Sequence, residues 1–135
     1  MSRRKLREHL FKLVFLHAFN SSNAMPEQIE LYLDGIEHIT DEEKTFLRNR
    51  YEQIASHVGE IDEMLNSTAR GWKTSRFNSC DLAVLRVAVF EMEFDEMIPD
   101  GVAINEAVEL AKLYGGDDSP SFINGILGEL SRRAK

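Results

Sequence analysis

Residues 102–130 have the sequence VAINEAVELAKLYGGDDSPSFINGILGEL, which predicts a helix, a tight turn and a second helix. Apolar residues recur at the spacing of one helical face before the turn: Ile104, Ala107, Val108 and Ala111. A second apolar face follows it: Phe122, Ile123, Ile126, Leu127 and Leu130. Gly115 and Gly116 end the first helix, because glycine readily adopts the left-handed conformation that often closes helices. Ser119 followed by Pro120 predicts the start of the second.

The same periodicity predicts helices through the rest of the chain. The expected ranges are about 3–19, 26–36, 41–58, 61–69, 79–94, 102–114 and 119–130. The helix over 79–94, with Ser79 as its N-cap, is apolar almost all round and is therefore expected to be the central, most buried one. No alternating strand pattern is present. The sequence predicts an all-α fold of about seven helices packed as a bundle.

Length and composition indicate one domain over residues 1–135. A chain of 135 residues can bury its own core without disulfides or metal. Its single cysteine, Cys80, excludes an internal disulfide and favours a reducing, cytoplasmic setting. No apolar run approaches the ~20 residues of a membrane span, and no basic-then-apolar leader is present. We therefore expect a soluble, cytoplasmic protein with no membrane segment.

Charge is distributed unevenly along the chain, whose net charge is −7. Residues 1–25 hold five bases and one acid, whereas residues 26–66 hold eleven acids and three bases. This pattern fits one anionic partner and one basic partner. The basic residues near the start are Arg3, Arg4, Lys5, Arg7 and Lys12. They indicate either a nucleic-acid contact or a solvated helix, in which Lys5, Glu8 and Lys12 form an intrahelical charge ladder.

Patterns typical of enzymes and metal sites are absent from the sequence. Its four histidines are scattered, and Cys80 lacks the spacing of a zinc site, so we expect no metal and no cofactor. The turn carries Asp117 and Asp118 where a phosphate-binding loop would carry a lysine. Tyr114 and Phe122 flank this turn and predict either base-stacking rings or core residues. We therefore expect no catalytic activity.

Arg86 interrupts the otherwise apolar helix over 79–94. A buried guanidinium requires a partner, because an unpaired buried charge is strongly unfavourable. Our hypothesis is that Arg86 pairs with Glu91 or Glu106 and joins the fifth and sixth helices. Asn105 and Asn124 are expected to satisfy backbone groups near the turn.

Two segments together resemble the NusB transcription antitermination family. They are LAVLRVAVFEM (82–92) and IPDGVAINEAVELAKLYGGDDSPSFINGIL (98–127), and the N-terminal RRKLRE is also similar to that family's arginine-rich start. The resemblance covers the whole length, but residues 20–70 match only in helical pattern. It implies two packed helical bundles, over about 1–70 and 71–135.

The resemblance also implies binding to boxA RNA of ribosomal RNA transcripts. Its implied partners are NusE, a ribosomal small-subunit protein, and the RNA polymerase antitermination complex. The implied RNA-binding residues are Arg3, Arg4, Arg7, Lys112, Tyr114, Asp118 and Phe122. Those implied to face NusE are Phe15, Arg76 and Asp81. A homodimer through the basic helix, which would hide the RNA surface, is a further state that the family suggests.

Two other interpretations stay open at this point. The first is a helical protein-interaction adaptor that binds a basic protein and no RNA. The second is a detached accessory domain of an RNA cytosine methyltransferase, because a similar helical domain precedes some of those catalytic domains.

Overall fold

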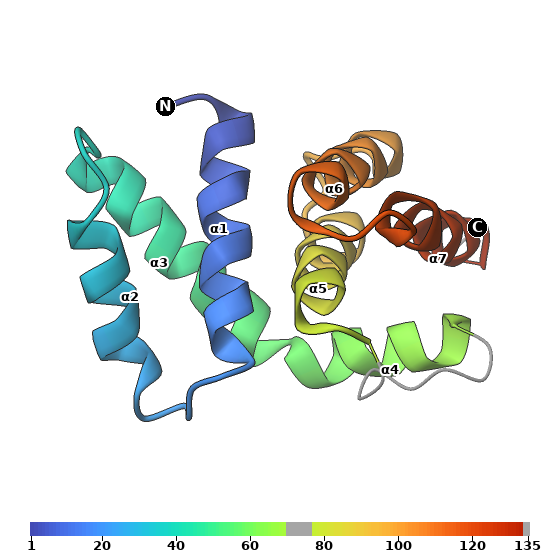
Figure 1. The fold of residues 1–135 in the computed structure, drawn as a ribbon, viewed down its shortest axis with the longest axis horizontal. Coiled ribbons are helices and arrows are strands. Elements are labelled where there is room, and N and C mark those ends of the chain that lie inside the picture. The colour runs from blue at the N-terminus through green and yellow to red at the C-terminus, as the bar shows by residue number, and fades with distance from the viewer. Residues whose placement is uncertain (70–76, 134–135) are drawn as a thin grey trace. The chain divides into compact units, whose positions relative to one another are not determined.

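The computed structural model describes residues 1–69 and 77–133, and all regular structure within them is helical (Figure 1). The helices are α1 (Arg3–His17), α2 (Met25–Asp34), α3 (Asp41–Ser56), α4 (Val58–Thr68), α5 (Ser79–Phe94), α6 (Asp100–Tyr114) and α7 (Ser119–Arg133). The expected all-α fold of about seven helices is confirmed. In the part of the chain that is described, no helix is long and apolar enough to cross a membrane.

The first compact unit, Met1–Ser56, contains α1, α2 and α3. Helix α1 packs against both of the others. Their buried side chains include Leu10, Leu13, Val14, Ile29, Leu33, Leu47 and Ile54. A capping box starts α3: the Thr40 N–H donates to Glu43 Oε1 (2.9 Å), and the Glu43 N–H donates to Thr40 Oγ1 (3.1 Å).

The second compact unit, His57–Lys135, is built around α5. This helix contacts α4, α6 and α7, and ten of its sixteen residues are buried. Its expected central position within the later helices is confirmed. The N-cap is Asn78 rather than Ser79, because Asn78 Oδ1 accepts a hydrogen bond from the Asp81 N–H at 2.7 Å.

Helix α4 belongs with the later helices. It packs against α5 and α7, and its apolar residues Ile61 and Leu65 are fully buried. The boundary between the two units therefore falls after Ser56, whereas the resemblance implies a division near residue 70. An amphipathic period shows that a helix has a buried face but not which neighbours cover it.

Arg86 pairs with neither of the two partners expected from the sequence, Glu91 and Glu106. Its Nε and Nη2 donate to the two carboxylate oxygens of Asp62 on α4, at 3.0 and 2.7 Å. This bidentate ion pair joins α5 to α4. The expected pairing of Arg86 between α5 and α6 is therefore wrong. Asp62 is 24 residues away in sequence, and helical periodicity contains no information about contacts at that separation.

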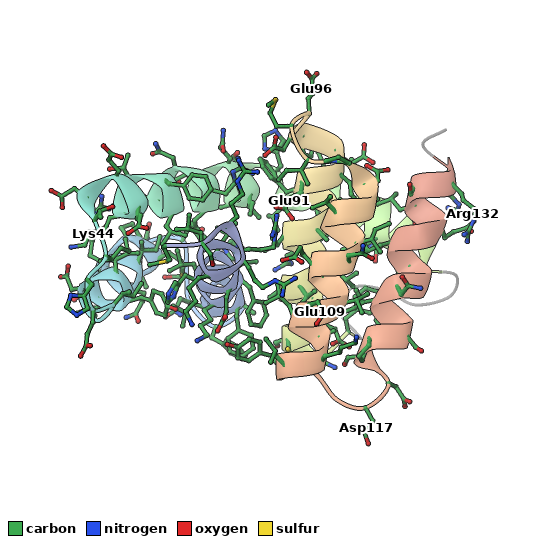
Figure 2. All side chains as sticks on the ribbon, turned by 90° about the horizontal axis from the view of Figure 1, so that it is seen from above. Lys44, Glu91, Glu96, Glu109, Asp117 and Arg132 are labelled. Atoms are coloured by element: carbon green, nitrogen blue, oxygen red, sulfur yellow. The ribbon has the colours of Figure 1, made fainter. Side chains whose placement is uncertain are left out.

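Helices α6 and α7 contact one another and are joined by the short turn between Tyr114 and Ser119. Figure 2 shows Asp117 pointing outward at the tip of this turn, while Glu96 lies beyond the opposite end of α6. Arg132 points away from α7 near its C-terminal end (Figure 2). The sequence-predicted site at the turn therefore lies at one end of the α6–α7 pair.

Candidate nucleic-acid interface

The turn between α6 and α7 is tightly packed around Gly115. A Cβ added at Gly115 would lie 2.6 Å from Ser119 Cβ and 2.8 Å from the Ala111 carbonyl oxygen. The Gly116 N–H donates to Ser119 Oγ at 3.1 Å, and Ser119 is buried. These contacts hold the start of α7 against the end of α6.

The conformation of Gly115 corrects the reason predicted for it. Its φ is −92° and its ψ is −179°, which is extended backbone and not the left-handed helix cap that we expected. Any residue can adopt that conformation. Glycine is required at this position because there is no space for a side chain next to Ser119.

The predicted RNA-binding residues of the second unit gather around this turn. Lys112, Tyr114 and Asp118 are exposed, and 38% of Tyr114 is accessible. Phe122 is half-buried and meets Phe77 edge-on, with ring centroids 5.3 Å apart and an interplanar angle of 87°. One exposed ring and one half-buried ring therefore flank the turn, and their role in stacking on bases stays a prediction.

The charge at the turn is mostly negative. Lys112 Nζ lies 3.4 Å from Glu109 Oε1, so its charge is partly balanced by a neighbour on the same helix. Asp117 and Asp118 follow within the turn and are both exposed. Phosphate binding is not favoured by this balance, whereas base stacking depends little on it. The turn is therefore better suited to bases than to backbone phosphates.

Residues near the turn also correct one smaller expectation. Asn105 and Asn124 are exposed, so neither is a buried amide that must satisfy the backbone. The Cys80 thiol donates to the Tyr114 carbonyl at 3.4 Å, which ties the end of α6 to the start of α5. Burial raises the pKa of this thiol, and a protonated thiol is a weak nucleophile.

The predicted arginines of the first unit lie at the start of α1. Ser2 caps this helix by accepting a hydrogen bond from the Lys5 N–H at 3.0 Å. Arg3 and Arg4 are exposed and Arg7 is half-buried. Such arginines can contact phosphates through paired N–H donors.

Lysines next to these arginines form the predicted charge ladder. Lys5 Nζ and Lys12 Nζ lie 3.5 and 3.8 Å from Glu8 Oε1, so this expectation is confirmed. Glu8 therefore partly balances the charge of both lysines.

Two histidines hold α1 to the other helices of its unit. His9 Nδ1 lies 2.6 Å from the Tyr32 hydroxyl on α2, and His17 Nδ1 lies 2.8 Å from the Tyr51 hydroxyl on α3. Burial lowers the pKa of His9, with Lys5 as the next contribution. Burial also raises the pKa of Tyr32 to about 12, so its phenol stays protonated at neutral pH. These contacts fix the helix that carries the arginines.

Candidate partner-facing residues have three different environments. Phe15 is half-buried in a row of rings, 6.3 Å from Phe11 and 5.1 Å from the exposed Phe19 between centroids. Arg76 lies outside the described residues. Asp81 is only 6% exposed. Its Oδ2 accepts a hydrogen bond from Asn78 Nδ2 at 3.0 Å, whereas its buried Oδ1 has no hydrogen-bond donor among residues 1–69 and 77–133.

No group of three or more metal-ligating side chains occurs within residues 1–69 and 77–133. Arginines, lysines and aromatic rings of the kind found at α1 and at the turn can bind nucleic acid by charge and stacking.

Comparison with known proteins identifies the family. The sequence model of the NusB family matches residues 4–132. The chain belongs to the NusB family. It is 46% identical to the transcription antitermination protein NusB of Lachnoclostridium phytofermentans, over 96% of this chain and 98% of that protein. It is 42% identical to the protein of the same name from Agathobacter rectalis, over 97% of this chain and all of that protein.

Solved structures agree with this family assignment. The NusB of T. maritima has a TM-score of 0.84 and 31% identity, over 98% of this chain and 92% of that chain. A structure of antitermination factors NusB and NusE in complex with double-stranded RNA has a TM-score of 0.85. At 18% identity, over 97% of this chain and 96% of that chain, this second match supports the NusB fold alone.

Proposed function

We propose that this chain is a transcription antitermination factor that binds boxA RNA of ribosomal RNA transcripts together with NusE. The observation that carries the proposal is its membership of the NusB family, matched over residues 4–132. Full-length relatives at 46% and 42% identity are named transcription antitermination proteins. A structure of the same fold contains NusB, NusE and RNA. Such a factor works without catalysis and acts where transcription occurs, in the cytoplasm.

RNA binding is assigned to two sets of residues, one in each unit. The first set is Arg3, Arg4 and Arg7, which neutralise phosphates. The second set is Lys112, Tyr114, Asp118 and Phe122, whose rings stack on bases. Asp118 accepts a hydrogen bond from a base or a 2′-hydroxyl. This division agrees with the mostly negative charge of the turn, which favours contacts with bases over contacts with phosphates.

NusE binding is assigned to Phe15, Arg76 and Asp81. The row of rings around Phe15 supports an apolar contact, because Phe19 at its end is exposed. The second unit is acidic along residues 79–110, with eight acids and one base. That charge suits a basic ribosomal protein and increases the rate of encounter. NusE in turn connects the factor to RNA polymerase, and a homodimer through α1 would block the arginines.

A charge-matched pair of variants tests the RNA surface. The first replaces Arg3, Arg4 and Arg7 with alanine. The control replaces Lys44, Arg48 and Arg50 of α3 with alanine, which removes the same charge from the same unit. Lys44 and Arg48 form partly exposed ion pairs with Asp34 and Glu30, and pairs of this kind typically contribute about 0–1 kcal/mol each.

Binding of boxA RNA is measured by fluorescence anisotropy at several salt concentrations. The arginine variant should lose affinity, and its slope of log K against log salt should become shallower by about 2, since each neutralised phosphate on a single strand contributes about 0.7. The control should retain most of the wild-type affinity. Equal losses in the two variants would show that only net charge matters and would refute the assigned surface. Retention of NusE without RNA by the wild type would favour the protein-only adaptor.

A further inference from the structure

A groove runs along α7 from the turn towards the C-terminal end of that helix. It has a volume of about 470 Å³, within the range of small-ligand sites. Ala69, Phe122 and Ile126 supply its apolar lining, Gly125 lies between the last two, and Glu129 and Arg132 stand at its far end. Phe122 therefore belongs both to the groove and to the proposed RNA-binding turn.

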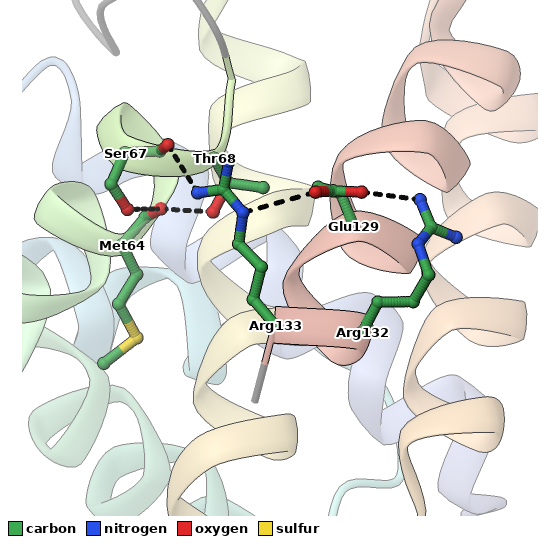
Figure 3. A network of polar contacts seen from close by, with 6 residues as sticks. All are labelled: Met64, Ser67, Thr68, Glu129, Arg132 and Arg133. Atoms are coloured by element: carbon green, nitrogen blue, oxygen red, sulfur yellow. Dashed lines mark hydrogen bonds and ion pairs between the residues drawn. The ribbon is translucent and has the colours of Figure 1, made fainter. Parts of the chain in front are cut away.

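The far end of the groove is held by a polar network (Figure 3). Arg133 Nη1 donates to the Ser67 carbonyl at 2.7 Å, which satisfies a backbone acceptor in the last turn of α4. Glu129 accepts hydrogen bonds from Arg132 Nη2 at 2.7 Å and from Arg133 Nε at 3.3 Å. These contacts join the ends of α4 and α7, the two helices that line the groove.

The charge at this end is positive. Glu129 supplies one negative charge, shared between two arginines, and hydrogen bonding from Arg132 lowers the pKa of Glu129 so that it stays ionised. The side chain of Arg132 is 72% exposed. A guanidinium has five N–H donors, and within the described residues Arg132 donates only through its Nη2, to Glu129. The other donors can therefore contact an anion.

An apolar groove with the cation of Arg132 at one end matches the chemistry of a nucleotide. Its base is flat and largely apolar on both faces, and its phosphate is an anion that arginine binds with paired donors. A basic protein segment fits less well, because its charge would oppose that of Arg132. Phe122 and Arg132 are ten positions apart, which is about 15 Å along a helix, so the groove extends away from the turn.

We propose that this groove is a second RNA subsite: it receives the base that follows those held at the turn, with a phosphate on Arg132. This inference rests on the proposed RNA-binding function. It predicts that the protein reads a longer stretch of RNA than the turn alone contacts, and that nucleotides flanking boxA on one side increase affinity.

Gly125 provides the means to block the groove. A Cβ added there meets no other atom within 4 Å, so a larger side chain would extend into open space. Replacement of a helical glycine also favours the helix. We therefore choose Gly125→Leu, which should fold normally and fill the groove. Asn124→Leu is the matched control, because Asn124 is the neighbouring exposed residue and does not line the groove.

The experiment measures the Kd of boxA RNA alone and of boxA RNA extended by three uridines at its 5′ or its 3′ end. Circular dichroism confirms that each variant is folded. Wild-type protein should bind one of the extended RNAs roughly 5- to 150-fold more tightly than the short one, as expected for one stacked base. Gly125→Leu should abolish this gain and leave short-RNA binding unchanged, whereas Asn124→Leu should keep the gain. Arg132→Gln should reduce it and weaken its salt dependence.

Each other outcome has a defined meaning. If wild-type protein binds the short RNA but gains nothing from either extension, the groove is no RNA subsite and the proposed function survives. A gain that persists in Gly125→Leu leads to the same conclusion. If Gly125→Leu instead weakens NusE binding and keeps the RNA gain, the groove binds protein and the inference is wrong. Failure of the wild type to bind any of the RNAs, with or without NusE, overturns both the proposed function and the subsite.

Discussion

Replacement of Gly115 by alanine should disrupt the turn between α6 and α7. The added methyl group would lie 2.6 Å from Ser119 Cβ and 2.8 Å from the Ala111 carbonyl oxygen. Ordinary contacts between such atoms are about 3.5–4.0 Å, so the start of α7 must move by roughly 1 Å. Overpacking of this kind typically costs about 1–3 kcal/mol of folding free energy. Gly116→Ala is the matched control, because a Cβ there meets nothing within 4 Å.

The same movement should weaken RNA binding, because it changes the spacing of Tyr114 and Phe122 across the turn. Loss of one stacked base corresponds to about 1–3 kcal/mol, or a roughly 5- to 150-fold rise in Kd. Urea denaturation measures the stability change and fluorescence anisotropy with boxA RNA measures the affinity. Wild-type stability in Gly115→Ala would refute the steric argument. Lower stability with unchanged RNA affinity would show that the turn is not part of the interface.

Further predictions concern stability. Asp62→Ala should lower the unfolding free energy by about 2–4 kcal/mol, because it leaves Arg86, only 11% exposed, without its partner. Arg86→Met should lower the unfolding free energy by less, or raise the Tm, since Asp62 is 24% exposed and keeps some access to water. A Tm loss in Arg86→Met as large as that in Asp62→Ala would contradict this order. Burial lowers the pKa of folded His9 below its unfolded value of 6.5. Neutral His9 therefore contributes its full stability above about pH 6.5, and this contribution is lost as the pH falls below that value. His9→Asn should remove this part of the pH dependence in urea titrations between pH 7.5 and 5.5, and identical curves would refute it.

Local sequence patterns predicted the helices well because their causes are local. The apolar surface of residues 79–94 predicted a buried α5. Such a feature depends on residues within one or two turns of each other. Charge pairs at helical spacing, as in Lys5 with Glu8, belong to the same class.

Contacts between distant residues could not be predicted in this way. The sequence showed that Arg86 needs a partner, but Asp62 lies 24 residues away and could not be identified from local patterns. The His9–Tyr32 contact spans 23 residues, and nothing in the intervening sequence indicates it. Gly115 illustrates another limit: a glycine can supply an unusual conformation or simply space, and only the position of Ser119 decides between them.

The predicted site residues show the same difference between local features and contacts between distant residues. Residues around the turn are close in sequence, so the exposed Lys112 and Tyr114 could be placed together from the helical pattern. Asp81 was implied as a partner contact by resemblance alone, and its burial became visible only with the structure. The groove along α7 was missed, because its lining combines α7 with the end of α4.

The most direct test of RNA recognition is a fluorescence-anisotropy titration of boxA RNA against a scrambled RNA of the same composition, with and without NusE, at two salt concentrations. The account predicts that boxA RNA binds more tightly than the scrambled RNA and that NusE increases this preference. Higher salt should weaken both complexes through the phosphate contacts while the preference remains. Equal binding of the two RNAs that disappears at high salt, unchanged by NusE, would contradict it and leave only nonspecific electrostatic attraction.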